Sequence, residues 1–339
     1  MSTRTLTFRE AINEAMRLEM RRDPTVIVMG EDVAGGAGTH LEAAGEEAWG
    51  GPLGVTKGLV TEFGRDRVLD TPISESAFIG AAAGAAATGL RPIAELMFVD
   101  FFGVCMDQIY NQAAKLRYMS GGKVQVPMVV RSMIGAGFGA GPQHSACHYS
   151  VFAHMPGLKT VVPATPYDAK GLLISAIRDP DPVMFFEHKM LYDIIGEVPE
   201  GDYTIPLGVA DIKRQGKDVT VVAIGRMVHL ALEAAEKLSQ DSVDAEVIDL
   251  RSLSPLDEST VLQSVKKTHR LVVVDEDNPR CSMACDVVAL VSERGFDDLD
   301  APPRTVTAPH TPVPFSPPLE QYYIPSVDNI VSTVRSLFK

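Results

Sequence analysis

The chain has 339 residues, 45% of them hydrophobic, so it can bury substantial cores and most simply forms two domains. Its 44 acidic and 31 basic residues give a net charge of −13, which argues against a nucleic-acid binder. The four cysteines lack Cys-x-x-Cys spacing, and no uninterrupted apolar run reaches the about 20 residues needed to cross a bilayer. We therefore expect a cytoplasmic protein with no signal peptide and no membrane contact.

The first half of the chain alternates strand-like and helical segments. Thr7-Phe8-Arg9-Glu10 predicts a capping box that opens a helix ending near Arg22. Strands are predicted over 25–29, 67–73, 91–96, 127–134, 160–162 and 183–186, and helices over 75–89, 104–119 and 167–178. Continuous apolar strands separated by helices predict an α/β fold with a mainly parallel sheet covered on both faces. The glycine-rich stretch 35–54 has no periodicity and predicts a long functional loop.

A second α/β unit follows a change of composition. Residues 192–208 are rich in Gly, Pro and acidic side chains, which predicts a linker between domains spanning 1–191 and 209–339. Strands are predicted over 219–224, 245–250 and 271–275, and helices over 227–238, 260–268 and 283–294. The proline-rich tail 302–325 predicts an extended covering segment, followed by a last helix from Val327.

The first candidate site is Asp70-Thr71-Pro72-Ile73-Ser74-Glu75, which precedes a run of Gly and Ala over 77–89. A carboxylate between a strand end and such a helix is partly desolvated, which suits Glu75 to sharing a proton. The alternative is a plain helix start, with Ser74 as N-cap and Glu75 favoured by the helix dipole. The small residues also let another backbone approach closely, so we expect this helix to pack against a partner.

The second candidate is the glycine-rich segment Gly135–Gly141. Ala140 breaks the G-x-G-x-x-G spacing and no Lys-Ser/Thr follows, so nucleotide binding is disfavoured. We expect a mobile loop that presents His144 for proton transfer. Together with Cys147 and His148 this residue could suggest zinc, but no second ligand pair lies nearby in the sequence.

Two further groups have a simple structural explanation. The apolar side chains around Asp100, namely Met97, Phe98, Phe101 and Phe102, are on their own typical of a core. At the end of the 167–178 helix, Asp179 and Asp181 lie beside free carbonyl groups, an oxygen donor set that suits a hard cation. The pattern is equally that of a common Asp-Pro turn.

In combination, these segments resemble the β subunits of the heterotetrameric thiamine-diphosphate-dependent 2-oxo acid dehydrogenases, which include pyruvate, branched-chain and acetoin dehydrogenases. The resemblance runs from Val28-Met29-Gly30-Glu31-Asp32 to Tyr323-Ile324-Pro325. It is carried by Asp70 to Glu75, Ala113-Ala114-Lys115, Gln143-His144-Ser145, Pro156-Gly157-Leu158-Lys159 and Asp168-Ala169-Lys170-Gly171-Leu172. The second half, with Val247-Ile248-Asp249-Leu250-Arg251, is similar to the C-terminal domain of the transketolase superfamily. The implied fold is a transketolase-like pyrimidine-binding domain followed by that C-terminal domain.

This resemblance implies roles for the candidate residues. Glu75 matches the carboxylate that hydrogen-bonds the aminopyrimidine of thiamine diphosphate and stabilises its imino tautomer, which deprotonates the thiazolium carbon. Ile73, Met97 and Phe101 are expected to bind the cofactor, the last two by walling its aminopyrimidine. His144 matches the histidine that meets the substrate or the incoming lipoyl group.

The resemblance also bears on metals and partners. A structural K⁺ site is implied at the carbonyl groups of three residues and two carboxylates: Met128, Ala176, Ile177, Asp179 and Asp181. The chain contains neither Gly-Asp-Gly nor Asn-Asn, whose oxygens normally hold the Mg²⁺ of the diphosphate. We therefore expect an α subunit to supply that half of the site in an α₂β₂ heterotetramer, and the isolated chain to be inactive. A lipoyl-bearing dihydrolipoyl acyltransferase is the implied acceptor.

The substrate is indicated by two segments. The length of 35–54, with Ala48-Trp49-Gly50-Gly51, and the tail segment from Pro309 to Ser316 resemble the acetoin type, so the predicted activity is acetoin cleavage with acetyl transfer. The alternatives are a pyruvate or branched-chain 2-oxo acid dehydrogenase β subunit, or a non-catalytic subunit that docks the acyltransferase core. Ala146 stands where the family usually has Gln, which removes an amide near the expected reaction centre.

Overall fold

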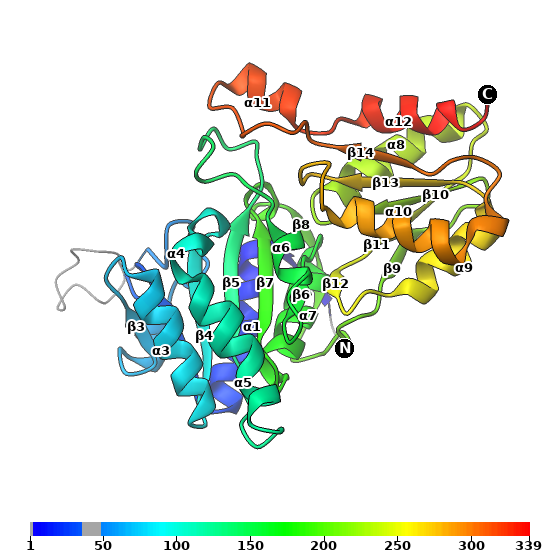
Figure 1. Cartoon of the computed structure of the whole chain (residues 1–339). Coiled ribbons are helices and arrows are strands. Elements are labelled where there is room, and N and C mark those ends of the chain that lie inside the picture. Colours follow the sequence, from blue (N-terminus) through cyan, green and yellow to red (C-terminus); the bar gives the residue numbers. More distant parts are fainter. Residues whose placement is uncertain (1–2, 36–48) are drawn as a thin grey trace.

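The computed structural model describes residues 3–35 and 49–339, and these residues form a seven-stranded, a five-stranded and a two-stranded sheet. Helices cover the two larger sheets, which belong mainly to the first and second halves of the chain (Figure 1). No helix of the described part is long and apolar enough to cross a membrane. The predicted loop over 35–54 falls largely on residues 36–48, which lie outside the described residues.

The seven-stranded sheet has the order β12-β6-β7-β5-β4-β2-β3 and is parallel apart from β12. Its strands are β2 (Val26–Gly30), β3 (Val68–Asp70), β4 (Arg91–Phe98), β5 (Val129–Ile134), β6 (Lys159–Val161), β7 (Val183–His188) and β12 (Ser252–Ser254). Every residue of β2, β5 and β7 is buried, as expected for a parallel sheet covered on both faces. The α/β class and the main strands are therefore confirmed.

The helices of the first half are α1 (Phe8–Arg22), α2 (Leu59–Phe63), α3 (Glu75–Ala87), α4 (Phe102–Asp107), α5 (Ala114–Met119), α6 (Tyr149–Ala153) and α7 (Pro166–Arg178). The capping box of Thr7 and Glu10 is present and confirms the start of α1. The single helix predicted over 104–119 is wrong. Cys105 has non-helical dihedrals, and a π-helical stretch, Gln108–Ala113, separates α4 from α5.

The segment expected as a linker is partly a strand. Within it, β8 (Ile195–Pro199) pairs antiparallel with β1 (Thr3–Thr7), so this stretch folds back on the start of the chain. The pairing joins residues almost 200 positions apart, and a local composition of Gly, Pro and acids does not reveal it.

The five-stranded sheet has the order β14-β13-β10-β11-β9, with β9 antiparallel to its neighbour. Its strands are β9 (Asp211–Arg214), β10 (Val219–Ala223), β11 (Ala245–Asp249), β13 (Leu271–Asp275) and β14 (Arg304–Thr307). The helices are α8 (Met227–Gln240), α9 (Glu258–Thr268), α10 (Met283–Arg294), α11 (Pro317–Tyr323) and α12 (Val327–Ser336). The predicted strands and helices of this half are confirmed within a few residues.

The tail 302–325 is more than an extended cover. It supplies β14, a parallel strand beside β13, and the short helix α11, which lies beside the loop that follows β5 (Figure 1). Proline at the start of α11 costs no hydrogen bond because the first N–H groups of a helix lack internal partners. The two halves are also interlocked, since β12 from the second half extends the first sheet beside β6.

Candidate active site

The predicted catalytic residues lie after the carboxyl ends of parallel strands. Glu75 opens α3 after β3, and His144 lies on the loop that follows β5. In open parallel sheets the carboxyl ends of the strands meet at one edge, which is where α/β proteins place their reactive groups. The fold thus gives both residues positions suited to chemistry.

Glu75 occupies the first turn of α3 and is half-buried. Burial and the charge of Glu75 raise the pKa of Glu31, which follows β2. Burial and the same charge raise the pKa of the Cys105 thiol to about 12. Ser74 takes the N-cap position, but its side chain donates to the Pro72 carbonyl instead of capping the helix. The helix start therefore does not depend on a Ser74 cap, and Glu75 faces other acidic groups.

His144 lies edge-on to two phenylalanine rings. Its ring centre is 4.8 Å from that of Phe98 and 5.5 Å from that of Phe101, with interplanar angles of 84°. Lys189, which follows β7, donates a hydrogen bond from Nζ to the His144 carbonyl. Sequence reasoning placed Phe98 in the core and missed Lys189. No local pattern marks a lysine as the partner of a loop carbonyl 45 positions away.

Phe101 links the two predicted catalytic residues through one segment. It belongs to the short 3₁₀ turn Val99–Phe101, which leads directly into α4. That helix carries Cys105, which feels the charge of Glu75, and Ser76 of α3 donates to the Val104 carbonyl. The same stretch of chain therefore touches the start of α3 on one side and the His144 ring on the other. Met97 is half-buried at the end of β4, two residues after the buried Glu95.

The glycine-rich loop is anchored by carboxylates. Ala136 N–H donates to Glu276 Oε1 at 2.7 Å, and Gly137 N–H donates to Glu320 Oε1, also at 2.7 Å. Gly139 N–H donates to Glu320 Oε2 at 3.0 Å. Side chains of the chain itself therefore accept from these amides and anchor the loop, and the mobility that the sequence predicts stays a prediction. Glu276 follows a buried strand within Asp275-Glu276-Asp277, a signal that could have identified it.

A zinc site at the loop finds no support. Burial raises the pKa of the Cys147 thiol well above its ordinary value, which opposes the thiolate that zinc needs. Burial also lowers the pKa of His148, whose ring lies 5.7 Å from that of Phe102. Within residues 3–35 and 49–339, no group of three or more His, Cys, Asp or Glu side chains could hold a metal ion.

The oxygens of the expected potassium site all have protein partners. Lys159 Nζ lies 2.7 Å from both carboxylate oxygens of Asp179, and Arg117 pairs with Asp181. Arg91 donates to the carbonyls of Ile177 and Asp179. The Met128 and Ala176 carbonyls accept backbone N–H groups from Val183 and Asp179. A bound K⁺ would compete with three cationic side chains, and the potassium site stays a prediction.

Ala146 lies on the His144 loop, and both of its backbone groups are hydrogen-bonded. Its N–H donates to Asp100 Oδ1 at 3.3 Å, and its carbonyl accepts from Gly135 N–H at 3.1 Å. The other Asp100 oxygen is buried and has no hydrogen-bond partner in the described chain. A cavity of about 340 Å³ adjoins Ala146 and is also lined by His148, Asn278 and His310. The structure thus has space beside the position where the family usually has Gln.

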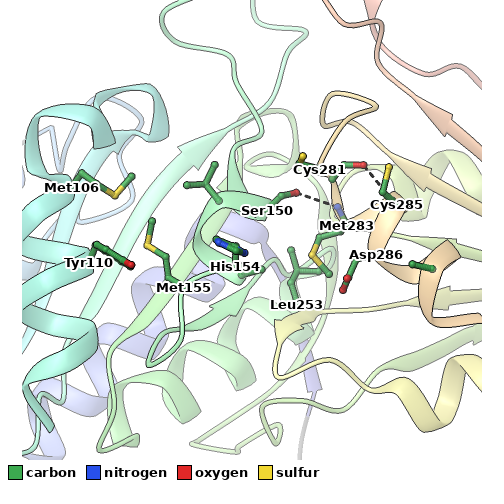
Figure 2. Close-up of a pocket in the computed structure, with 14 residues that line it drawn as sticks. Met106, Tyr110, Ser150, His154, Met155, Leu253, Cys281, Met283, Cys285 and Asp286 are labelled. Atoms are coloured by element: carbon green, nitrogen blue, oxygen red, sulfur yellow. Dashed lines mark hydrogen bonds between the residues drawn. The ribbon is translucent and has the colours of Figure 1, made fainter. Parts of the chain in front are cut away.

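A larger cavity, of about 900 Å³, lies elsewhere between the two halves. Figure 2 shows thioether and thiol side chains facing it from both halves, among them Met106 and Met155 from the first and Cys281, Met283 and Cys285 from the second. None of the residues predicted for catalysis or cofactor binding lines it. Volume alone therefore does not locate the predicted site.

Apolar surface remains uncovered beside Glu75. Ile73 is 83% exposed and Val104 is 61% exposed, and small residues of α3 such as Ala77, Ala81 and Gly84 are also exposed. Thr71 Oγ1 is buried without a hydrogen-bond partner in the described chain. A carboxylate, an open apolar side chain and an unpaired polar atom fit the aminopyrimidine half of thiamine diphosphate.

Comparisons with known proteins show the family and its two domains. The family model for the transketolase pyrimidine binding domain matches residues 4–194, and that for the transketolase C-terminal domain matches 208–330. The chain is 62% identical to the beta subunit of acetoin:2,6-dichlorophenolindophenol oxidoreductase from Bacillus subtilis (98% of this chain, 97% of the relative). It is 60% identical to the Cupriavidus necator protein of that name (99% and 98%).

A more distant relative also matches over nearly its full length. The chain is 43% identical to the beta subunit of the pyruvate dehydrogenase E1 component of Bacillus subtilis, over 98% of this chain and 99% of the relative. Among solved structures, an inactive β4 tetramer of a split-gene transketolase matches with a TM-score of 0.76 and 22% identity, over 98% of both chains. That structural match supports the fold alone.

Proposed function

The chain belongs to the β subunits of the acetoin and 2-oxo acid dehydrogenases, and we propose that it serves an acetoin dehydrogenase, binding thiamine diphosphate together with an α subunit. The single observation that carries this proposal is the difference in identity. Two acetoin:2,6-dichlorophenolindophenol oxidoreductase beta subunits are 60–62% identical to the chain, whereas the pyruvate and 2-oxoisovalerate dehydrogenase subunits reach 43–45%. In the proposed reaction the C–C bond of acetoin breaks, acetaldehyde leaves, and an acetyl group passes to a lipoyl disulfide, which is reduced.

Thiamine diphosphate would supply a carbon nucleophile and an electron sink, chemistry that no side chain provides. The role proposed for Glu75 is to hold a proton between its carboxyl group and a ring nitrogen of the aminopyrimidine. Glu31 lies within electrostatic range of Glu75, because burial and the charge of Glu75 raise the pKa of Glu31. Ile73, Met97 and Phe101 would provide the apolar contact surface of the ring.

His144 is proposed to orient the substrate carbonyl or the incoming lipoyl disulfide and to move the proton that this transfer requires. The edges of the Phe98 and Phe101 rings restrict its rotation, and Lys189 fixes the carbonyl of the same residue. Holding a catalytic group in one orientation lowers the entropy cost of the reaction.

An α subunit is proposed to complete the site and to hold Mg²⁺ and the diphosphate. The absent Gly-Asp-Gly and Asn-Asn motifs support this partner, as do the exposed Ile73 and Val104 side chains and the small residues on the open face of α3. The proposed assembly is an α₂β₂ heterotetramer in the cytoplasm. Its proposed acetyl acceptor is a lipoyl-bearing acyltransferase.

The deciding experiment is dye reduction by the co-expressed α–β complex with Mg²⁺ and thiamine diphosphate, comparing acetoin, pyruvate and a branched 2-oxo acid. A clear preference for acetoin supports the proposal. A preference for a 2-oxo acid would instead assign the chain to a pyruvate or branched-chain 2-oxo acid dehydrogenase. Glu75→Gln should reduce kcat by about 10²-fold or more, since general acid–base groups contribute on that order.

Glu236→Gln, at an exposed position of α8, is the matched control and should keep wild-type turnover. Gel filtration should show intact assembly in both variants. If Glu75→Gln keeps near wild-type turnover and the same quenching of fluorescence on thiamine diphosphate binding, Glu75 has no catalytic role. That result would favour the alternative, a non-catalytic subunit that docks the acyltransferase.

A further inference from the structure

Glu276 uses both carboxylate oxygens. Besides the Ala136 amide, it contacts His188 Nε2 through Oε2 at 2.9 Å, and its side chain is almost fully buried. His188 Nδ1 accepts a hydrogen bond from Met190 N–H at 3.2 Å. This pattern assigns the ring proton to Nε2, which donates to Glu276. Glu276 therefore joins the loop after β5 to the end of β7.

The end of β7 leads directly to His144. Lys189, the residue after His188, donates to the His144 carbonyl, and its Nζ lies 5.3 Å from the centre of the Phe98 ring. Burial lowers the pKa of Lys189, while acidic groups around it oppose that effect. A continuous set of contacts thus runs from Glu276 through His188 and Lys189 to the backbone of His144.

Glu320 holds the same loop from another direction. It lies on α11, is 3% exposed, and accepts from the amides of Gly137 and Gly139. The Phe315 ring, from the segment before α11, lies so close to Gly141 that a Cβ there would come within 2.7 Å of it. The tail of the chain therefore packs directly on the loop that presents His144.

We propose that Glu276 and Glu320 are positioning residues for His144, through which the C-terminal half of the chain sets the geometry of the active-site loop. This inference rests on the proposed function for its kinetic consequences, but not for its structural ones. Neither glutamate needs to touch the substrate. Free backbone amides of a glycine-rich loop bind negative charge, and here Glu276 provides it for Ala136 and Glu320 for Gly137 and Gly139.

The hydrogen bonds at Glu276 require a carboxylate, because both of its side-chain oxygens act as acceptors. Glu276 accepts a hydrogen bond at each oxygen, whereas glutamine has one acceptor oxygen and an NH₂ group that would face either Ala136 N–H or the Nε2–H of His188. A tautomer change of His188 could relieve this conflict only by losing the bond from Met190. Charge-assisted hydrogen bonds are also stronger than neutral ones, so Gln should loosen the loop and allow His144 to shift.

The first measurement is hydrogen–deuterium exchange of the purified α–β complex, resolved on peptides covering 135–144. Glu276→Gln and Glu320→Gln should accelerate exchange in these peptides by at least about tenfold, because the affected amides exchange a charged acceptor for a weaker neutral one. Peptides of α8 and α12 should be unchanged, which shows that the variants are folded. Glu258→Gln removes an exposed carboxylate paired with Arg294 and is the matched control, with no change over 135–144.

The second measurement is kinetic. Glu276→Gln and Glu320→Gln should lower kcat about 10- to 100-fold, the scale expected when a catalytic group shifts by a fraction of an ångström to 1 Å, with little change in KM. In a His144→Gln background the same substitutions should cost less than about threefold, because residues that act through one group are not additive. A general loss of stability would instead lower kcat by the same factor in the wild-type and His144→Gln backgrounds.

Chemical rescue tests the charge itself. Glu320→Ala leaves the Gly137 and Gly139 amides without their acceptor, and added formate should restore part of kcat and of the exchange protection, whereas chloride should not.

Unchanged exchange over 135–144 and wild-type kcat in both Gln variants would overturn the proposal, as would full additivity with His144→Gln. If exchange changes as expected but the wild-type complex does not turn over acetoin or a 2-oxo acid, the proposed function fails and the anchoring of the loop stands.

Discussion

Arg131 on β5 offers the sharpest test of what holds the first sheet together around the active site. Its side chain is 2% exposed and lies between two glutamates, donating to Glu95 at 2.7 Å and to Glu187 at 2.6 and 2.8 Å. Tyr192 donates a further hydrogen bond to Glu187. Burial alone would lower the pKa of Arg131, but the charges of Glu187 and Glu95 outweigh it and raise this pKa.

Arg131→Met should reduce the free energy of unfolding by about 3–5 kcal/mol, because removing one partner of a buried ion pair leaves an uncompensated charge. Here two carboxylates would lose their partner, so the cost should lie toward the upper end. Burial raises the pKa of Glu95 even with Arg131 present. Without Arg131 the carboxyl groups take up protons more readily in the folded state, so the loss should be smaller at pH 5 than at pH 8.

Urea unfolding of the purified chain, followed by circular dichroism, measures this loss. The matched control is Arg294→Met, which breaks an exposed pair with Glu258 and should cost less than about 1 kcal/mol. Adding Glu95→Gln to Arg131→Met should recover part of the loss, because only one buried carboxylate then remains unpaired. Equal costs for Arg131→Met and Arg294→Met would refute the reasoning.

Two further predictions concern the backbone and pH. A Cβ at Gly157 would lie 2.0 Å from the Ala114 carbonyl oxygen, so Gly157→Ala should reduce the free energy of unfolding by several kcal/mol. Gly64 has a similar positive φ but lies in open space. Gly64→Ala should therefore cost only about 1–2 kcal/mol in the same urea assay. Equal costs would show that the backbone at Gly157 moves freely. Burial, with the charge of Asp168, raises the pKa of Asp249 from 3.8 to about 8. Between about pH 4 and 8 the folded state therefore binds a proton at Asp249 that the unfolded state has lost, so the free energy of unfolding falls as pH rises across this range. Asp249→Asn should flatten this slope. An unchanged slope would contradict the raised pKa of Asp249.

Local signals in the sequence were sufficient for the main elements and for the position of Glu75. The capping box at Thr7 and the buried apolar runs at 26–30 and 271–275 depend on neighbours within a few residues, and the structure confirms them. The short strands β1, β8, β9, β12 and β14 were missed because each depends on a distant partner. The break at Cys105 is likewise invisible in a pattern that continues as helical on both sides.

The surroundings of His144 illustrate the same limit. Its position after a strand end followed from the sequence, because the apolar run 127–134 gives way directly to glycines, which end a strand and begin a loop. Its partners did not follow: Glu276 lies 140 positions from Ala136, and Glu320 lies 183 positions from Gly137. Nothing local distinguishes Glu320 from the many solvated glutamates of an acidic chain.

The glycine-rich loop shows why its pattern was open to more than one interpretation. Amides that point to one place require negative charge, but they do not specify whether a phosphate, another anion or a side chain supplies it. The motif spacing disfavoured a nucleotide, and the contacts with Glu276 and Glu320 identify the source as the second half of the chain. That half also adds β12 to the first sheet and buries Asp168 against Arg251. The loop that carries His144 is therefore shaped by residues outside the stretch 4–194 that matches the pyrimidine binding domain, which is a physical reason for the two domains to occur in one chain.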